Sequence, residues 1–167
     1  QEARLWKQLW SLEEFITKRI KTRPISELVV LTDQDKTLLE SFVNTAASVE
    51  DTVQDGKPVD ALRLVEEFIV SGISAGYLTS EGKRLDTKDE ASWYVMWAVG
   101  LGLLKMVAPV VPNVAEEFYQ QYFRDREGAP SIHTVDWPEP FSKLDRAKAV
   151  PAAKPSPKKR GGQKSSR

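Results

Sequence analysis

Residues 93–112, which read WYVMWAVGLGLLKMVAPVVP, decide the fold. Apolar side chains lie on nearly every side of a helix drawn through this stretch, which is typical of a helix buried by several neighbours. Pro109 and Pro112 mark the end of this helix and the start of the next one. We interpret Gly100 and Gly102 as positions of close helix packing rather than as a hinge. The apolar run is too short to span a bilayer as a helix.

Apolar residues spaced by three and four continue on the N-terminal side and predict further helices. We expect helices from Arg4 to Lys21, from Thr32 or Asp33 to a turn at Asp55-Gly56, and from Pro58 to a frayed end at Ser80-Glu81-Gly82. Thr32 and Asp33 can cap the second of these, because their side chains accept hydrogen bonds from free helical N–H groups. The central helix should begin near Asp86-Thr87 and run to Pro109, with a short linker over residues 25–31.

A fifth helix is expected from Pro112 or Asn113, with Val114, Phe118 and Tyr122 inward. Alternation from Ser131 to Trp137 predicts a short extended segment. From Lys143 onward the chain is rich in Lys, Pro, Ala, Gly and Ser, which predicts a disordered basic tail. The sequence therefore predicts an all-α bundle of about five helices over residues 1–142, followed by a tail over 143–167.

Composition excludes several kinds of chemistry. The chain has no cysteine and a single histidine, His133, so disulfides, thiol nucleophiles and multi-histidine metal sites are ruled out. The 24 basic and 24 acidic residues balance, but the basic ones concentrate at the C-terminus, and residues 1–150 carry about −6. Bulk charge by itself argues against nucleic-acid binding by the folded part.

Two motifs indicate a family. Residues 108–120, APVVPNVAEEFYQ, resemble the "APxxPxxxEExxQ" signature of valyl, isoleucyl and leucyl tRNA synthetases. Downstream, residues 131–139, SIHTVDWPE, resemble the "S-[IV]-H-x-x-x-[WY]-P" segment that closes the same helical domain. Upstream, Leu9–Phe15 resembles "KLWNxxRF", and Asp35–Leu39 stands where the family writes "DRWIL". Tyr77-Leu78, followed by Lys83-Arg84-Leu85, stands where it writes "YLExxKxRL".

The chain also departs from the family pattern. Thr37 replaces a tryptophan, Ser71-Gly72 replaces a Trp-Asp pair, and Ala75-Gly76 replaces a pair such as Cys-Asp. These departures put tRNA contacts of the second and third predicted helices in doubt.

The resemblance implies the anticodon-binding part of a class I synthetase, with valyl favoured over isoleucyl and leucyl because no cysteine-rich C-terminal zinc region is visible. Its partners would be the tRNA anticodon stem-loop and the catalytic domain of the same polypeptide, in the cytoplasm and away from membranes. ATP and Mg²⁺ would belong to that catalytic domain, since "HIGH" and "KMSKS" motifs are absent and Lys105-Met106 lies in an apolar helix. No cofactor and no catalytic residue are expected in this chain. Gln1 in place of Met suggests that it begins inside a longer reading frame.

Basic residues near the ends of the predicted helices are the candidate tRNA contacts, because loops and element ends often carry binding groups. They are Lys18, Arg19, Lys21, Arg23, Lys83, Arg84, Lys88, Arg124 and Arg126. The tail adds cations that could contact any polyanion: Lys154, Lys158, Lys159, Arg160, Lys164 and Arg167. Each of these residues could instead be an ordinary solvated charge.

Other readings remain open. Glu116-Glu117 is interpreted as a solvated acidic pair at a helix start rather than an acid/base pair, because adjacent helical residues point about 100° apart. His133 is expected to pack beside Trp137 rather than contact a nucleotide. The whole chain could also be a helical protein-interaction module, or a trans-acting tRNA-binding module, descended from a synthetase and without catalytic activity.

Overall fold

The computed structural model describes residue 14, residues 30–87 and residues 89–137, and every regular element within them is helical. This confirms the all-α fold. The predicted helix over residues 4–21, most of the linker and the tail lie outside the described residues. The elements are α2 (Asp33–Gln54), α3 (Pro58–Glu67), the π-helix η1 (Phe68–Tyr77), α4 (Leu78–Asp86), α5 (Glu90–Val107), α6 (Pro112–Tyr122), α7 (Arg124–Glu127) and the 3-10 turn η2 (Ile132–Thr134).

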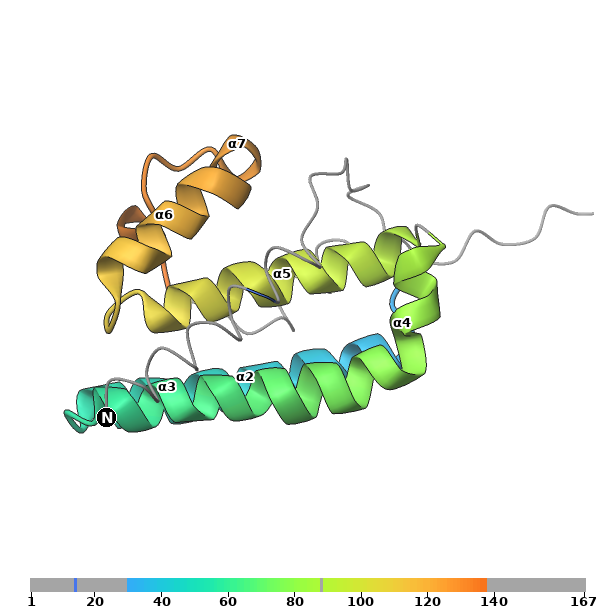
Figure 1. Cartoon of the computed structure of the whole chain (residues 1–167), viewed down its shortest axis with the longest axis horizontal. Helices are drawn as coiled ribbons and strands as arrows, with labels where there is room; N and C mark the ends of the chain where they lie inside the picture. The colour runs from blue at the N-terminus through green and yellow to red at the C-terminus, as the bar shows by residue number, and fades with distance from the viewer. Residues whose placement is uncertain (1–13, 15–29, 88, 138–167) are drawn as a thin grey trace, which may run out of the picture.

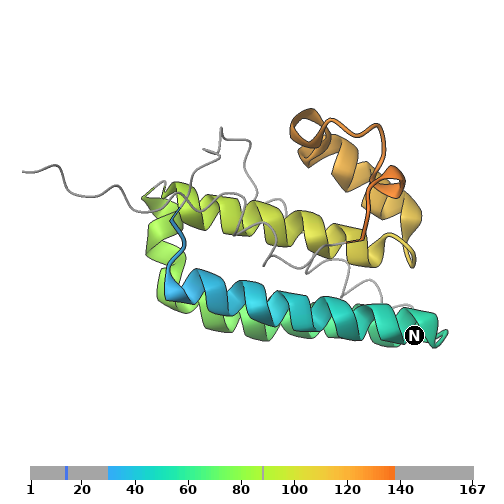
Figure 2. The same ribbon diagram turned by 180° about the vertical axis from the view of Figure 1, so that it is seen from behind.

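The helices are arranged in two layers and a cap. In Figure 1, α2 and the continuous rod α3–η1 lie side by side, and α4 rises from the end of the rod to the start of α5. The helix α5 then runs back over the pair. Figure 2 shows α6 and α7 on the far side of α5, where they cap its C-terminal end. No helix in the described part of the chain is both long and apolar enough to cross a membrane.

The central helix α5 is buried nearly all round, as its composition predicts. Fourteen of its 18 residues are buried. Its close contact with α2 depends on Gly102, where an added β-carbon would lie 2.3 Å from the Cζ atom of Phe42. Phe42 is fully buried and its ring meets that of Phe68 edge-on at 5.8 Å. The packing interpretation of Gly102 is therefore confirmed.

The predicted starts of α2 and α3 are also confirmed. Thr32 and Asp35 form a reciprocal capping box at the start of α2, and Pro58 occupies the first turn of α3. Between these helices Gly56 has a φ of 73°, a left-handed conformation that glycine adopts without a steric penalty.

The predicted boundary between the third and fourth helices is wrong in two respects. The helix does not fray at Ser80-Glu81-Gly82 but continues to Asp86, because Arg84 in its last turn is held by carboxylates on α2 and α4. The next helix begins at Glu90 rather than near Asp86-Thr87, since the side chain of Asp89 accepts the Ser92 N–H and so caps α5.

Two local geometries differ from the prediction. The π-helix over Phe68–Tyr77 was not foreseen; its wider turn keeps residues spaced by four, Ile69, Ile73 and Tyr77, on the buried face. Between Ser131 and Trp137 the backbone is not extended throughout, because Ile132–Thr134 forms a 3-10 turn. The Ser131 hydroxyl accepts the His133 N–H and stabilises this turn.

Candidate functional site

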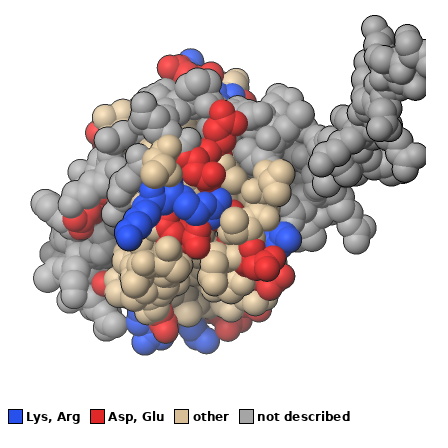
Figure 3. Space-filling view, turned by 90° about the vertical axis from the view of Figure 1, so that its right-hand side faces the viewer, with Lys and Arg blue, Asp and Glu red and all other residues tan. Residues whose placement is uncertain are grey.

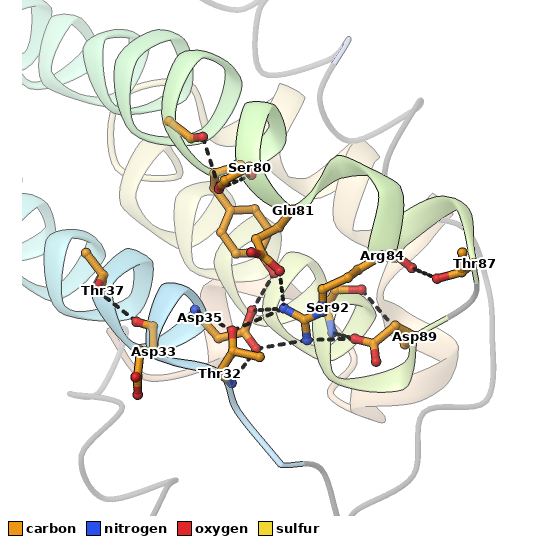
Figure 4. A network of polar contacts seen from close by, with 12 residues as sticks. Thr32, Asp33, Asp35, Thr37, Ser80, Glu81, Arg84, Thr87, Asp89 and Ser92 are labelled. Carbon is orange, nitrogen blue, oxygen red and sulfur yellow. Dashed lines mark hydrogen bonds and ion pairs between the residues drawn. The ribbon is translucent and has the colours of Figure 1, made fainter.

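A buried charged cluster joins the starts of α2 and α5 to α4. Asp35 is fully buried, and both of its carboxylate oxygens accept hydrogen bonds from Arg84, each at 3.1 Å (Figure 4). The Tyr77 hydroxyl donates to Asp35 at 2.6 Å and the Thr32 N–H at 2.8 Å. Arg84 also binds Glu81 at 2.6 Å and Asp89 at 2.8 Å. We call these five residues, Asp35, Tyr77, Glu81, Arg84 and Asp89, the corner cluster.

The electrostatics of the corner cluster follow from this geometry. Burial raises the pKa of Asp35, but the hydrogen bonds from Arg84, Tyr77 and Thr32 outweigh it and hold that pKa below its usual range. Burial and the neighbouring Asp35 carboxylate raise the pKa of the Tyr77 hydroxyl. Burial alone would lower the pKa of Arg84, but the bonds to Asp35 and Glu81 raise it. All three groups therefore keep their ordinary charges at neutral pH, and the cluster works as a brace rather than a site of proton transfer.

The candidate contacts of this region differ sharply in exposure. Lys83 is exposed, whereas the Arg84 guanidinium is committed to three carboxylates, with 24% of its side chain exposed. Lys88 lies outside the described residues. Figure 3 shows this end of the molecule with basic and acidic side chains close together rather than a continuous basic patch on the described surface. The structure thus assigns Arg84 to the brace and leaves Lys83 able to meet a ligand.

A second polar cluster holds the segment after α7 against α6. The Glu116 carboxylate accepts the Ser131 hydroxyl at 2.7 Å, the Ile132 N–H at 3.1 Å and the Gln120 amide at 2.6 Å. Gln120 also donates to the Pro130 carbonyl at 2.7 Å. The hydrogen bond from the Ser131 hydroxyl contributes most to holding the pKa of Glu116 below its usual range. Glu116 therefore does not fit the expected solvated pair, because the returning chain supplies its donors; Glu117 beside it is exposed.

The predicted contacts Arg124 and Arg126 lie on α7 and are both exposed. Arg124 donates to the Gln120 side-chain oxygen at 2.9 Å. The guanidinium of Arg126 lies 5.4 Å from the centroid of the Trp97 ring, within range of a cation–π interaction. The Trp97 indole N–H donates to Glu127 at 2.9 Å. Both arginines are thus held in place by α6 or by α5 while their ends face solvent.

His133, which was expected to pack beside Trp137, lies at the surface. Its side chain is 43% exposed, and its Nε2 atom lies 3.9 Å from a Glu116 carboxylate oxygen. Trp137, by contrast, is partly buried and packs against the core. The remaining candidate cations lie outside the described residues: Lys18, Arg19, Lys21, Arg23, Lys154, Lys158, Lys159, Arg160, Lys164 and Arg167.

Sequence reasoning named Asp35, Tyr77 and Arg84 within the family motifs but missed that they brace the site. The pattern Thr32-x-x-Asp35 is the usual signal of a capping box and was available from the sequence. That Asp35 also meets Tyr77 and Arg84, 42 and 49 residues away, was not readable from any local pattern.

Comparison with known proteins agrees with the fold and the motifs. Residues 35–159 match the family described as the anticodon-binding domain of tRNA ligase. An isoleucine–tRNA ligase of Pyrococcus furiosus is 31% identical over 135 residues, which are 78% of this chain and 12% of that protein. An isoleucine–tRNA ligase of Thermococcus kodakarensis is 32% identical over 112 residues, 64% of this chain and 10% of that protein.

A valine–tRNA ligase of Methanopyrus kandleri is 29% identical over 150 residues, which are 84% of this chain and 16% of that protein. The chain thus spans a small part of the length of these relatives. Because the family match covers most of the chain, including α2 to η2, this protein belongs to the anticodon-binding domain family of class I tRNA ligases.

Proposed function

We propose that this chain recognises the anticodon stem-loop of a tRNA as part of a tRNA ligase. The family match over residues 35–159 carries this proposal. Exposed cations at the ends of elements support it: Lys83 in the last turn of α4, and Arg124 and Arg126 on α7. Such groups bind phosphates, while polar and aromatic groups read unpaired bases.

Charge limits how much of the described surface can contact RNA. Residues 30–137 hold 9 Lys and Arg against 18 Asp and Glu. Several of the basic side chains are already beside a carboxylate, as in Lys36–Asp33 and Arg63–Asp60. Binding by this part of the chain should therefore depend on a few placed cations rather than on the overall field. Three phosphate contacts would give a slope of log K against log salt of about −2.

A further part of the proposal concerns which amino acid the tRNA ligase would attach. The sequence resemblance favours valine, with leucine the least favoured. Isoleucine is the second candidate, supported by relatives of 31% and 32% identity that are isoleucine–tRNA ligases, against 29% for a valine–tRNA ligase. The whole protein would attach one of these amino acids to tRNA in the cytoplasm, with ATP and Mg²⁺ bound by its catalytic domain.

A second candidate function is a helical protein-interaction module. Four of the five positions that depart from the family pattern, Thr37, Ser71, Ala75 and Gly76, are exposed. Ser71 and Gly72 line a shallow groove of about 360 Å³ between α2 and the α3–η1 rod, together with Ser41, Asn44, Thr45 and Ser48. Leu64, Phe68 and the acidic Glu67 complete its lining, and a groove without a cation fits a protein contact better than a phosphate contact.

Titration of the chain with isoleucine, valine and leucine tRNA transcripts tests the proposal. It is made at two salt concentrations, with the intact chain and with a chain that ends at residue 150, because affinity without salt control is uninterpretable. Recognition by the folded part predicts that both forms prefer the same tRNA. Equal binding of all three tRNAs by the intact chain, and no binding after the truncation, would favour the interaction module instead.

A further inference from the structure

Glu116 lies at the centre of an unbroken chain of hydrogen bonds on the capping unit. One end is Arg124, whose guanidinium donates to the Gln120 oxygen at 2.9 Å. Gln120 in turn donates to Glu116 at 2.6 Å. The other carboxylate oxygen of Glu116 accepts a hydrogen bond from the Ser131 hydroxyl. That hydroxyl in turn accepts the backbone N–H of His133 at 3.1 Å.

These bonds position the Arg124 guanidinium and the backbone of His133, and both residues are exposed. Arg124 follows the last turn of α6 and His133 lies in η2, and both of their segments contact α6. The orange segment in Figures 1 and 2 shows the chain returning from α7 past α6. The Tyr119 hydroxyl also holds this returning segment against α6, because it donates to the Ala129 carbonyl at 3.0 Å. In this set of bonds, the side chains of Glu116 and Gln120 therefore connect Arg124 to the segment that carries His133.

We propose that Arg124 and His133 are a pair of tRNA contacts, and that Glu116 and Gln120 are positioning residues that set them in place before the tRNA arrives. The inference rests on the proposed function and names the part of the surface that serves it. Arg124 supplies a guanidinium for a phosphate, and the His133 ring supplies an N–H donor and a face on which an unpaired base can stack. Holding the Arg124 guanidinium and the His133 backbone in advance lowers the conformational entropy lost on binding.

The neighbouring acid gives a discriminating control. Glu116 and Glu117 carry the same charge in the same turn of α6, but Glu117 is exposed. If only long-range charge mattered, removing either carboxylate would strengthen tRNA binding, because both repel phosphates. If Glu116 positions Arg124 and His133, its removal weakens binding while removal of Glu117 does not.

The experiment measures tRNA dissociation constants for the full chain and for Glu116→Gln, Glu117→Gln, Arg124→Ala and His133→Ala, each checked by a thermal melt. We expect Glu116→Gln to weaken binding by about threefold to tenfold, the effect of one or two lost hydrogen bonds. Glu117→Gln should leave binding unchanged or strengthen it. The Glu116→Gln effect should also shrink in a chain that already carries Arg124→Ala and His133→Ala, because coupled residues are not additive.

Gln120→Met is the second variant, for use if Glu116→Gln lowers the melting temperature below the assay temperature. It keeps the side-chain length and removes the bonds to Arg124, Glu116 and the Pro130 carbonyl, so it should weaken binding no further in a chain that carries both Arg124→Ala and His133→Ala. Equal effects of Glu116→Gln and Glu117→Gln, or additive losses with Arg124→Ala and His133→Ala, would overturn the inference while leaving the proposed function intact. A wild-type chain that bound no tRNA would overturn both.

Discussion

Replacement of Arg84 by methionine should be the most damaging single change in the corner cluster. The side chain of Asp35 is fully buried, so Arg84→Met leaves a carboxylate in the interior with only the Tyr77 hydroxyl and the Thr32 N–H as partners. Removal of one partner of a buried ion pair costs about 3–5 kcal/mol. Because those two donors remain and Arg84 is 24% exposed, we expect the lower end, about 3 kcal/mol.

The pH dependence of this change follows from the Asp35 carboxyl. Its pKa is lowered in the folded protein, so it contributes stability above its unfolded pKa of about 3.9, and this stability is lost as pH falls through the lower folded pKa. In Arg84→Met the cation that lowers this pKa is gone and burial remains. Protonation of Asp35 then removes the cost of burying its unpaired charge in the variant. The difference in unfolding free energy between the wild-type chain and Arg84→Met should therefore shrink from pH 7 to pH 4.

Urea unfolding followed by circular dichroism, at pH 7 and pH 4, measures both effects. The matched control is Arg63→Met, which removes an exposed arginine from a surface pair with Asp60 at 3.4 Å and should cost less than about 1 kcal/mol. If Arg84→Met were no more damaging than Arg63→Met, or its cost were the same at both pH values, the corner cluster would not be the brace described above.

Three further changes test other parts of the structure. Gly102→Ala should destabilise the chain by about 2 kcal/mol in the same urea assay, because the new methyl group meets Phe42. The control Gly82→Ala, where an added β-carbon has nothing within 4 Å, should stabilise α4 by up to about 1 kcal/mol. Equal effects of the two changes would contradict the packing at Gly102. Tyr77→Phe should cost about 1–2 kcal/mol by removing a donor from buried Asp35, and unchanged stability would show that its hydroxyl is dispensable. Lys83→Ala should weaken tRNA binding equally for all tRNA sequences and make the salt slope shallower by about 0.7 to 0.9, as loss of one phosphate contact requires; an unchanged slope in the binding titration would remove Lys83 from the interface.

The helical fold could be predicted because the longer helices have local signals of their own. The all-round apolar composition of α5, the Thr32 capping box and Pro58 each specify structure within a few residues. The boundary between α4 and α5 was misplaced because it depends on Arg84 reaching Asp35, 49 residues away. Sequence patterns carry no information on which distant partner a charged side chain finds.

The same contrast between local signals and distant contacts holds for the candidate site. Exposed cations at element ends, such as Lys83 and Arg124, could be named from the sequence because turn positions are readable. That Lys83 is exposed while the neighbouring Arg84 is held by carboxylates could not be predicted, since the difference depends on what packs against each of them. Glu116 was likewise taken for a solvated acid, because the chain that supplies its donors returns 15 residues later.

Exchange of anticodons between tRNA transcripts tests the central claim most directly. The chain is titrated with isoleucine and valine tRNA transcripts and with the same two molecules after their anticodons are swapped, at a fixed salt concentration. Recognition of the anticodon stem-loop predicts that the preferred tRNA changes with the swap, so that affinity follows the anticodon. Affinity that stays with the body of the tRNA, or that is equal for all four molecules, would contradict it.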